Sequence, residues 1–102
     1  MEIVLITYES ELDVDEVESL FRDRSQTYRE MRGLLQKFYL HDEESGRVGG
    51  IYVFDSEASA DRLFESDIHA SLRAAYKVRD IDIARYHVTF PLYESAEFPV
   101  SP

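Results

Sequence analysis

Hydrophobic positions along the chain change their period several times, which predicts a mixture of strands and helices. Residues 2–8 form a β-branched apolar run of strand length. Over 14–31 the apolar residues recur every three or four positions, which is the spacing of one face of a helix. These apolar positions are Val14, Val17, Leu20, Phe21, Tyr28 and Met31. The chain therefore begins with a predicted strand and a predicted helix.

Polar residues limit this predicted helix at both ends. Asp13 and Glu16 stand three residues apart at its start. This arrangement is typical of a helix N-terminus, because both carboxylates satisfy free backbone N–H groups and suit the positive end of the helix dipole. Gly33 follows the last apolar position and is typical of a helix end.

Two more strands are predicted in the middle of the chain. Residues 34–41 and 48–54 are apolar runs of strand length, and the polar segment between them contains the turn pair Ser45-Gly46. Strands joined by so short a loop form an antiparallel hairpin.

The following residues predict a second helical region and a fourth strand. Ser56 is expected to cap the helix, and Asp67 to cap a further helical turn. Asp80 leads into a strand over 81–90, and Pro91 ends it. The apolar members of the helical region are Ala58, Ala60, Leu63 and Phe64, followed by Ile68, Leu72, Ala75 and Tyr76.

The order of elements, β-α-β-β-α-β, predicts an α+β fold of ferredoxin-like topology. Right-handed crossovers place two helices on one face of a four-stranded antiparallel sheet with strand order 4-1-3-2. We assign residues 1–92 to this single domain, since the length suits one domain only. The tail 93–102 has no periodicity, and we expect it to be loose or packed on a neighbour through Phe98 and Val100.

Both faces of the predicted sheet are apolar over much of their area, and this favours a homodimer. In the first strand Ile3 and Leu5 point to one face, whereas Val4 and Ile6 point to the other. Helices cover only one face, so a monomer would expose the second as a large apolar patch. Two sheets that pack face to face would bury it and leave a pocket between them.

Composition and charge narrow the possible partners. The chain contains 21 acidic and 11 basic residues and has a net charge of −10, which disfavours nucleic acids and anionic membranes. Neither a membrane-spanning segment nor a signal peptide is recognisable, so we expect a cytoplasmic protein. The acidity suits either a high-salt cytoplasm or a docking face for a basic partner. Cysteine is absent, which excludes thiolate metal sites and cysteine nucleophiles.

The hairpin segment resembles a known family. Residues 38–54 read FYLHDEESGRVGGIYVF, and the strand, acidic turn and Gly-Gly-Ile-Tyr stretch are similar to those of YdhR-type mono-oxygenases. That family belongs to the dimeric α+β barrel superfamily, related to antibiotic-biosynthesis mono-oxygenases. Many of its members carry a His-Pro-x-His stretch in the second helix; His69 matches the second histidine, and Ser66 and Asp67 replace the first histidine and the proline.

The resemblance implies a dimeric barrel and leaves the activity open. The superfamily includes cofactor-independent oxygenases of aromatic substrates, haem-degrading enzymes, isomerases, dehalogenases and proteins with no demonstrated activity. We expect a cofactor-independent mono-oxygenase that acts on a small phenol-like or quinol-like substrate in the barrel pocket. The alternative is a non-catalytic dimer that binds a small hydrophobic or aromatic ligand.

The pair Gly49-Gly50 could belong to a phosphate loop, an RNA-binding strand or a structural feature. No glycine-rich fingerprint and no following Lys-Ser/Thr accompany it, and Gly49 and Ile51 stand where an RNA-binding strand needs aromatic residues. The structural interpretation is a bulge or a close backbone contact. A bulge would leave the side-chain faces of this strand undefined.

Candidate catalytic groups come from two strands. His41 shares a strand face with Tyr39, and His87 shares one with Arg85. A histidine can accept a proton near neutral pH and an arginine can stabilise the phenolate formed. We therefore choose His41, Arg85 and His87 as catalytic candidates. The candidates for the pocket wall are Tyr39, Tyr52 and His69.

The sequence gives no reason to expect a cofactor or a metal. The histidines lie too far apart in sequence for a local ligand set, and no carboxylate cluster accompanies them. A phenolate is electron-rich enough to react with oxygen directly.

Overall fold

The sheet and its helical layer come from a computed structural model, which describes residues 1–93. Residues 94–102, including Phe98 and Val100, lie outside the described residues. The elements in chain order are β1 (Glu2–Ser10), α1 (Val14–Arg29), β2 (Leu34–His41), β3 (Val48–Phe54), α2 (Glu57–Glu65), α3 (Asp67–Ala70), α4 (Leu72–Ala75) and β4 (Val78–His87).

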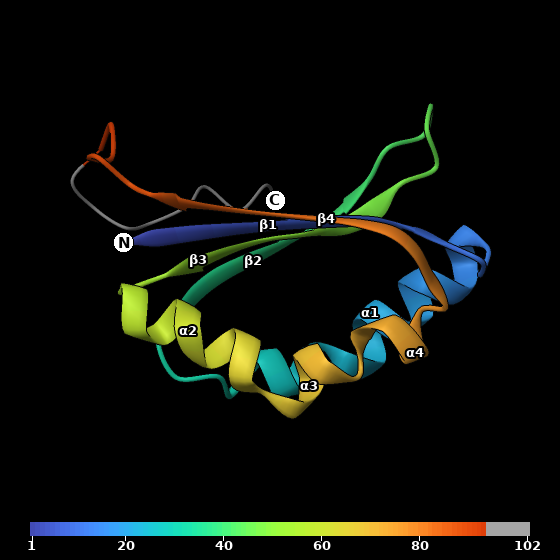
Figure 1. Ribbon diagram of the computed structural model, residues 1–102, viewed down its shortest axis with the longest axis horizontal. Helices are drawn as coiled ribbons and strands as arrows, with labels where there is room; N and C mark the ends of the chain where they lie inside the picture. Colours follow the sequence, from blue (N-terminus) through green and yellow to red (C-terminus); the bar gives the residue numbers. More distant parts are fainter. Residues whose placement is uncertain (94–102) are drawn as a thin grey trace.

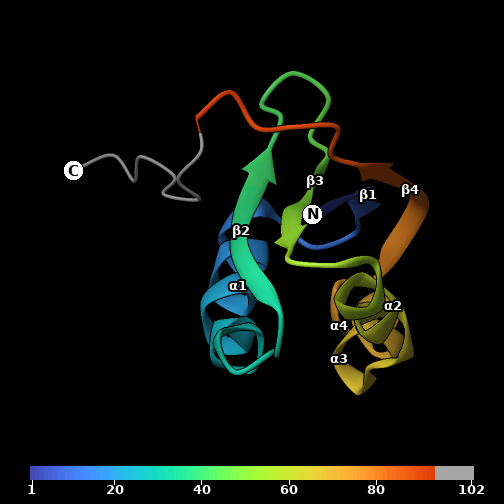
Figure 2. The same cartoon turned by 90° about the vertical axis from the view of Figure 1, so that its left-hand side faces the viewer.

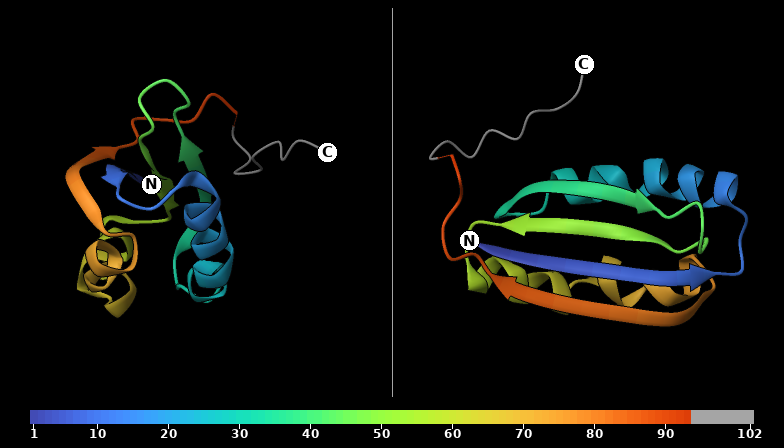
Figure 3. Two further views of the ribbon diagram at one scale, coloured as in Figure 1. Left: turned by 90° about the vertical axis from the view of Figure 1, so that its right-hand side faces the viewer. Right: turned by 90° about the horizontal axis from the view of Figure 1, so that it is seen from above.

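The four strands form one antiparallel sheet in the order β2-β3-β1-β4, which confirms the predicted order and the ferredoxin-like α+β fold. All the helices lie beneath the same face of the sheet (Figure 1). Helix α1 runs under the β2 side, whereas α2, α3 and α4 form a second group toward the β4 side (Figure 2). Within residues 1–93 the opposite face carries no helix (Figure 3). None of the helices within residues 1–93 is long and apolar enough to cross a bilayer.

Local sequence signals explain most of the element ends. Strands β2 and β3 have the predicted limits, and Asp13 caps α1 by accepting a hydrogen bond from the backbone N–H of Glu16 at 2.9 Å. Helix α1 ends near the predicted position, and Gly33 adopts a φ of +84° before β2 begins.

The predicted cap of α3 and both predicted ends of the last strand are wrong. Ser66, not Asp67, caps the turn α3, because its hydroxyl accepts a hydrogen bond from the backbone N–H of His69. The last strand is shifted toward the N-terminus and ends at His87, well before Pro91. It ends there because its partner strand β1 starts at Glu2, which is opposite His87 in the register.

The core forms between the helices and the face of β1 that carries Val4, Ile6 and Tyr8. Tyr8 is almost completely buried and packs on Tyr76, with ring centroids 5.6 Å apart. Ile3, on the other face, is half-buried. The alternation predicted for the first strand is therefore confirmed, and it defines a helix-covered face and an open face.

Gly49 and Gly50 form a close backbone contact and not a bulge. Both residues keep a regular register with the neighbouring strands, whereas register shifts occur at Leu34/Gln36 and at Tyr8/Glu9. A Cβ atom on Gly49 would overlap the backbone carbonyl oxygen of Ile6. One on Gly50 would lie 3.0 Å from Cε of Lys37. The pair therefore fixes the faces of β3 and leaves room beside Lys37.

We expect Gly49→Ala to destabilise the protein by roughly 3 kcal/mol, because the new Cβ meets backbone that cannot move aside easily. Gly46→Ala is the matched control: Gly46 also has a positive φ, of 78°, but a Cβ there meets nothing within 4 Å. Backbone strain alone should cost the control about 1 kcal/mol. Urea denaturation measures both; equal losses would contradict the close contact.

Candidate functional site

A groove lies between α1 and β2 on the helix-covered face. Its first cavity has a volume of about 330 Å³, within the range of small-molecule sites. Val17 and Phe21 of α1 and Val48 of β3 form its buried apolar floor. The ring of Tyr39 packs on Phe21 with centroids 4.7 Å apart, so aromatic surface borders the cavity.

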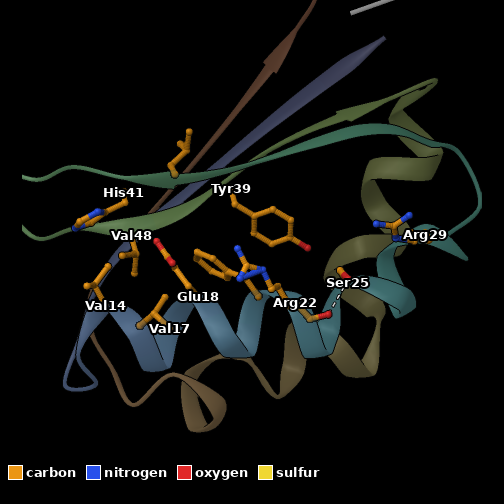
Figure 4. Close-up of a pocket in the computed structure, with 11 residues that line it drawn as sticks. Val14, Val17, Glu18, Arg22, Ser25, Arg29, Tyr39, His41 and Val48 are labelled. Atoms are coloured by element: carbon orange, nitrogen blue, oxygen red, sulfur yellow. Dashed lines mark hydrogen bonds between the residues drawn. The ribbon is translucent and has the colours of Figure 1, made fainter. Parts of the chain in front are cut away.

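Polar side chains surround this apolar floor. Figure 4 shows Tyr39 pointing from the sheet toward α1, with His41 at one end of the cavity and Arg29 at the other. Glu18 and Arg22 contribute from α1 between these ends. The cavity can thus hold an apolar ring with a polar substituent directed to its rim.

A second cavity of about 360 Å³ adjoins the first. Ser25, Arg29 and Tyr39 line both cavities, and the second one adds Tyr28 and Lys37. We refer to the two adjoining cavities together as the α1–β2 groove. Its two parts meet at the side chain of Tyr39.

Lys37 lies among three tyrosine rings. Its Nζ atom is 3.4 Å from the ring centroid of Tyr28, 4.4 Å from that of Tyr39 and 4.5 Å from that of Tyr52. Cations are attracted to such ring faces. The missing side chain at Gly50 leaves the space that the lysine methylenes occupy.

The electrostatics of Lys37 are unusual for a lysine. Burial lowers its pKa to about 7, and the positive charge of Arg24 contributes to the same effect. Within residues 1–93 no carboxylate pairs with the amine. Burial also raises the pKa of Tyr39, with a further contribution from Tyr28. The groove therefore favours a neutral amine beside neutral phenols.

Of the residues predicted from sequence, the structure brings Tyr39 and His41 to the groove. Tyr52 is buried in the core directly behind Lys37. His69 lies elsewhere, on α3, where its ring packs edge-on against Phe64 at 5.0 Å. It does not line either cavity of the groove.

Arg85 and His87 lie on β4, at the opposite edge of the sheet from β2. Arg85 pairs with Asp61 of α2 at 2.8 Å and donates a hydrogen bond to the carbonyl of Glu57 at 3.0 Å. His87 is exposed, with Nδ1 3.7 Å from a carboxylate oxygen of Glu2. The structure therefore does not bring these two residues together with His41 within one chain.

The cavity also differs in position from the one that the sequence suggested. Pairing across the strands aligns His41 and Tyr39 of β2 with Val48 and Gly50 of β3, and those with Tyr8 and Ile6 of β1. All of these side chains, where present, belong to the helix-covered face. The groove therefore lies between sheet and helix within one chain, not between two facing sheets.

Sequence reasoning missed Lys37 and the arginines of α1. A signal for Lys37 exists, because Lys37, Tyr39 and His41 alternate along one strand and share one face. Arg22 and Arg29 stand on the same side of α1 at a spacing of two helical turns. For metal binding, no group of three His, Asp or Glu residues gathers anywhere in residues 1–93.

The fold and the groove together define an α+β protein with a small-molecule cavity between its sheet and its first helix. The sequence profile described as "Putative mono-oxygenase ydhR" matches residues 3–97 of the chain. The protein therefore belongs to this ydhR family, as the hairpin segment predicted. No curated protein sequence matches the chain.

Solved structures of similar fold include mono-oxygenase-like proteins. One is a protein of Deinococcus radiodurans described as a "putative antibiotic biosynthesis monooxygenase". It has a TM-score of 0.74 at 15% identity, over 93% of this chain and 99% of the other. NE2512 of Nitrosomonas europaea, described as of unknown function, has a TM-score of 0.75 at 15% identity, over 98% and 95%. SnoaB of Streptomyces nogalater, described as a cofactor-independent oxygenase, has a TM-score of 0.71 at 14% identity, over 91% and 98%. At these identities the similarity establishes the fold alone.

We expect Lys37→Met to raise the free energy of unfolding at pH 7 and to flatten its dependence on pH. The folded protein holds the pKa of Lys37 near 7, whereas an unfolded chain keeps the ordinary value near 10.5. The unfolded state therefore binds more protons between these values, and wild-type stability should rise with pH by up to about 3 kcal/mol from pH 7 to pH 9.5. Urea denaturation across this range measures the slope.

Lys77→Met is the matched control for this experiment, because Lys77 is the only other lysine and is exposed. Its removal should leave the slope unchanged. If the slope persists in Lys37→Met as well, another group is responsible for it.

Proposed function

We propose that this protein is a cofactor-independent mono-oxygenase that acts on a small phenol or quinol bound in the α1–β2 groove. The observation that carries the proposal is the groove itself, which combines an apolar and aromatic floor with Tyr39, His41 and two arginines at its rim. Membership of the ydhR family supports an oxygenase. The described cofactor-independence of SnoaB, which has a similar fold, supports direct reaction with oxygen.

The proposed reaction needs no external reductant. Removal of the hydroxyl proton gives a phenolate, whose para carbon forms a bond to oxygen and yields a peroxide. Protonation of the distal oxygen and loss of the para C–H proton then break the O–O bond, so that one phenol and one O₂ give one quinone and one water. The substrate supplies both electrons that reduce the second oxygen atom.

The groove offers groups for each charge that this reaction develops. Arg22 and Arg29 can stabilise the phenolate from the α1 side, because guanidinium groups favour developing oxyanions. The hydroxyl of Tyr39 can donate a hydrogen bond to the same oxygen. His41 can exchange a proton with solvent at the outer end of the cavity.

One observation favours a second candidate function. Two of the three residues predicted as catalytic, Arg85 and His87, are distant from the groove on β4 and have local partners of their own. The alternative proposal is a non-catalytic protein that binds a small aromatic ligand in the same groove. Such a protein would bind phenols and consume no oxygen.

Oxygen uptake with a panel of monocyclic and bicyclic phenols and quinols tests the proposal. We expect uptake coupled to formation of the quinone, and a loss of at least about tenfold in kcat/KM in Arg29→Met, because the phenolate loses a stabilising charge. Arg79→Met serves as control, since Arg79 is an exposed arginine of β4 outside the groove. Binding of phenols without any oxygen uptake would favour the alternative function.

We further propose that the protein forms a homodimer through its open sheet face, in the cytoplasm as the sequence predicts. Phe38, Ile51 and Leu5 stand side by side across three neighbouring strands of this face. Phe38 is 38% exposed and Tyr86, on β4, is 58% exposed. A second copy would remove this apolar surface from water.

Sedimentation equilibrium tests the dimer. We expect twice the monomer mass of 11.9 kDa, and a shift toward monomer in Tyr86→Glu, because the carboxylate would be buried between the sheets. Ala74→Glu places the same charge on an exposed position of α4 and should leave the mass unchanged. A wild-type monomer at physiological salt would disprove the facing-sheet arrangement.

A further inference from the structure

The amine of Lys37 differs in its surroundings from the guanidinium of Arg85. Arg85 occupies the corresponding place at the other end of the same cross-strand row, Lys37–Tyr52–Val4–Arg85, and it is paired with Asp61. Lys37 has no acidic partner among the described residues. Lys37 is half-buried, and a cation that loses part of its water without gaining a counter-ion is unfavourable.

The groups that face Lys37 come from three elements. Helix α1 contributes Arg24, Tyr28 and Arg29, while β2 and β3 contribute Tyr39 and Tyr52. The removal of water and the charge of Arg24 oppose a charge on the amine, whereas the three ring faces attract a cation. Within residues 1–93 no carboxylate of the protein pairs with Lys37 to favour its charged form. An anion supplied by a ligand would therefore shift the protonation equilibrium of Lys37 toward the ammonium form.

The position of the amine suits contact with a ligand. Lys37 lines the second cavity of the groove, and Tyr39 lines both that cavity and the one that His41 borders. His41 is exposed and does not line the second cavity. A phenol whose ring lies beside Tyr39, which lines both cavities, can direct its hydroxyl toward Lys37 in the second cavity.

We propose that Lys37 is the proton acceptor of this site and takes the hydroxyl proton of a phenol bound in the α1–β2 groove. This inference rests on the proposed binding of phenols and does not require that they react with oxygen. In the step, the N–H bond of an ammonium forms as the phenolic O–H bond breaks, and the electron pair of that bond stays on the phenolate oxygen. The ammonium then lies between the phenolate and the three tyrosine rings.

The three tyrosine rings around Lys37 explain why a lysine can act as the proton acceptor. The uncharged amine is the form that burial beside Arg24 favours before the ligand binds. After the transfer, the ring faces and the phenolate together stabilise the cation. Arginine could not play this part, because it does not lose its proton near neutral pH.

Absorption spectra of bound 4-cyanophenol under nitrogen test the proton transfer without oxygen chemistry. We expect the apparent pKa of the bound phenol to lie about one unit or more below that of the free phenol, and this shift to become clearly smaller in Lys37→Met, where only the arginines still stabilise the phenolate. Lys77→Met, the matched control, should keep the shift. An unchanged shift in Lys37→Met, or no ionisation in the wild type, would overturn the proposal.

The outcomes for this proposal and for the oxygenase can be told apart. Ionisation of the bound phenol with no oxygen uptake in air would refute the oxygenase and support the role of Lys37. Oxygen uptake that persists with an unchanged pH profile in Lys37→Met would support the oxygenase and refute the role of Lys37. Failure of 4-cyanophenol to bind at all would overturn the role of Lys37, since its proton donor would be missing.

Competitive amine labelling gives a second readout that needs no ligand. With only two lysines and the N-terminal amine, mass spectrometry can follow acetylation of each site separately. After correction for accessibility by labelling at high pH, the reactivity of Lys37 should reach half its maximum near pH 7, well below the midpoint of an ordinary lysine in an unfolded chain. Equal midpoints for the two lysines would overturn the proposal.

Discussion

The close contact between Gly49 of β3 and the Ile6 carbonyl of β1 determines the arrangement of the site. It keeps the two central strands in regular register, so every side chain of the sheet has a defined face. Gly50, the next residue, then lies on the helix-covered face and leaves the room that Lys37 occupies. A one-residue slip would move Lys37 and Tyr39 relative to α1 and would destroy the groove. Two adjacent glycines thus connect the pairing of the sheet with the chemistry of its helix side.

Much of the fold could be predicted because it depends on local patterns. The strands β2 and β3, the cap at Asp13 and the order of the sheet follow from hydrophobic period and turn residues alone. The end of β4 could not be read in this way, because the strand stops where β1 no longer offers a partner. Ser66 and Asp67 are both good capping residues, and only the backbone of the α2–α3 turn decides between them.

The site was harder to predict than the fold, because it depends on distances between elements. Pairs such as Arg85 and His87 share a strand face as the sequence indicates, but the strand order puts them at the edge opposite His41. The importance of Lys37 depends on what surrounds it, namely three rings from α1, β2 and β3 and no carboxylate among the described residues. A single sequence shows that a lysine is present but not which groups surround it in the fold.

The net charge of −10 affects the rate at which charged ligands reach the groove. An anionic molecule approaches against the field of the whole protein, and its association rate rises as added salt screens that field over a distance of about 10 Å. A neutral phenol meets no such barrier, and its arrival is nearly independent of ionic strength. The acidic surface therefore favours ligands that arrive uncharged, and in the proposed reaction Arg22 and Arg29 would stabilise an anion that forms only after entry.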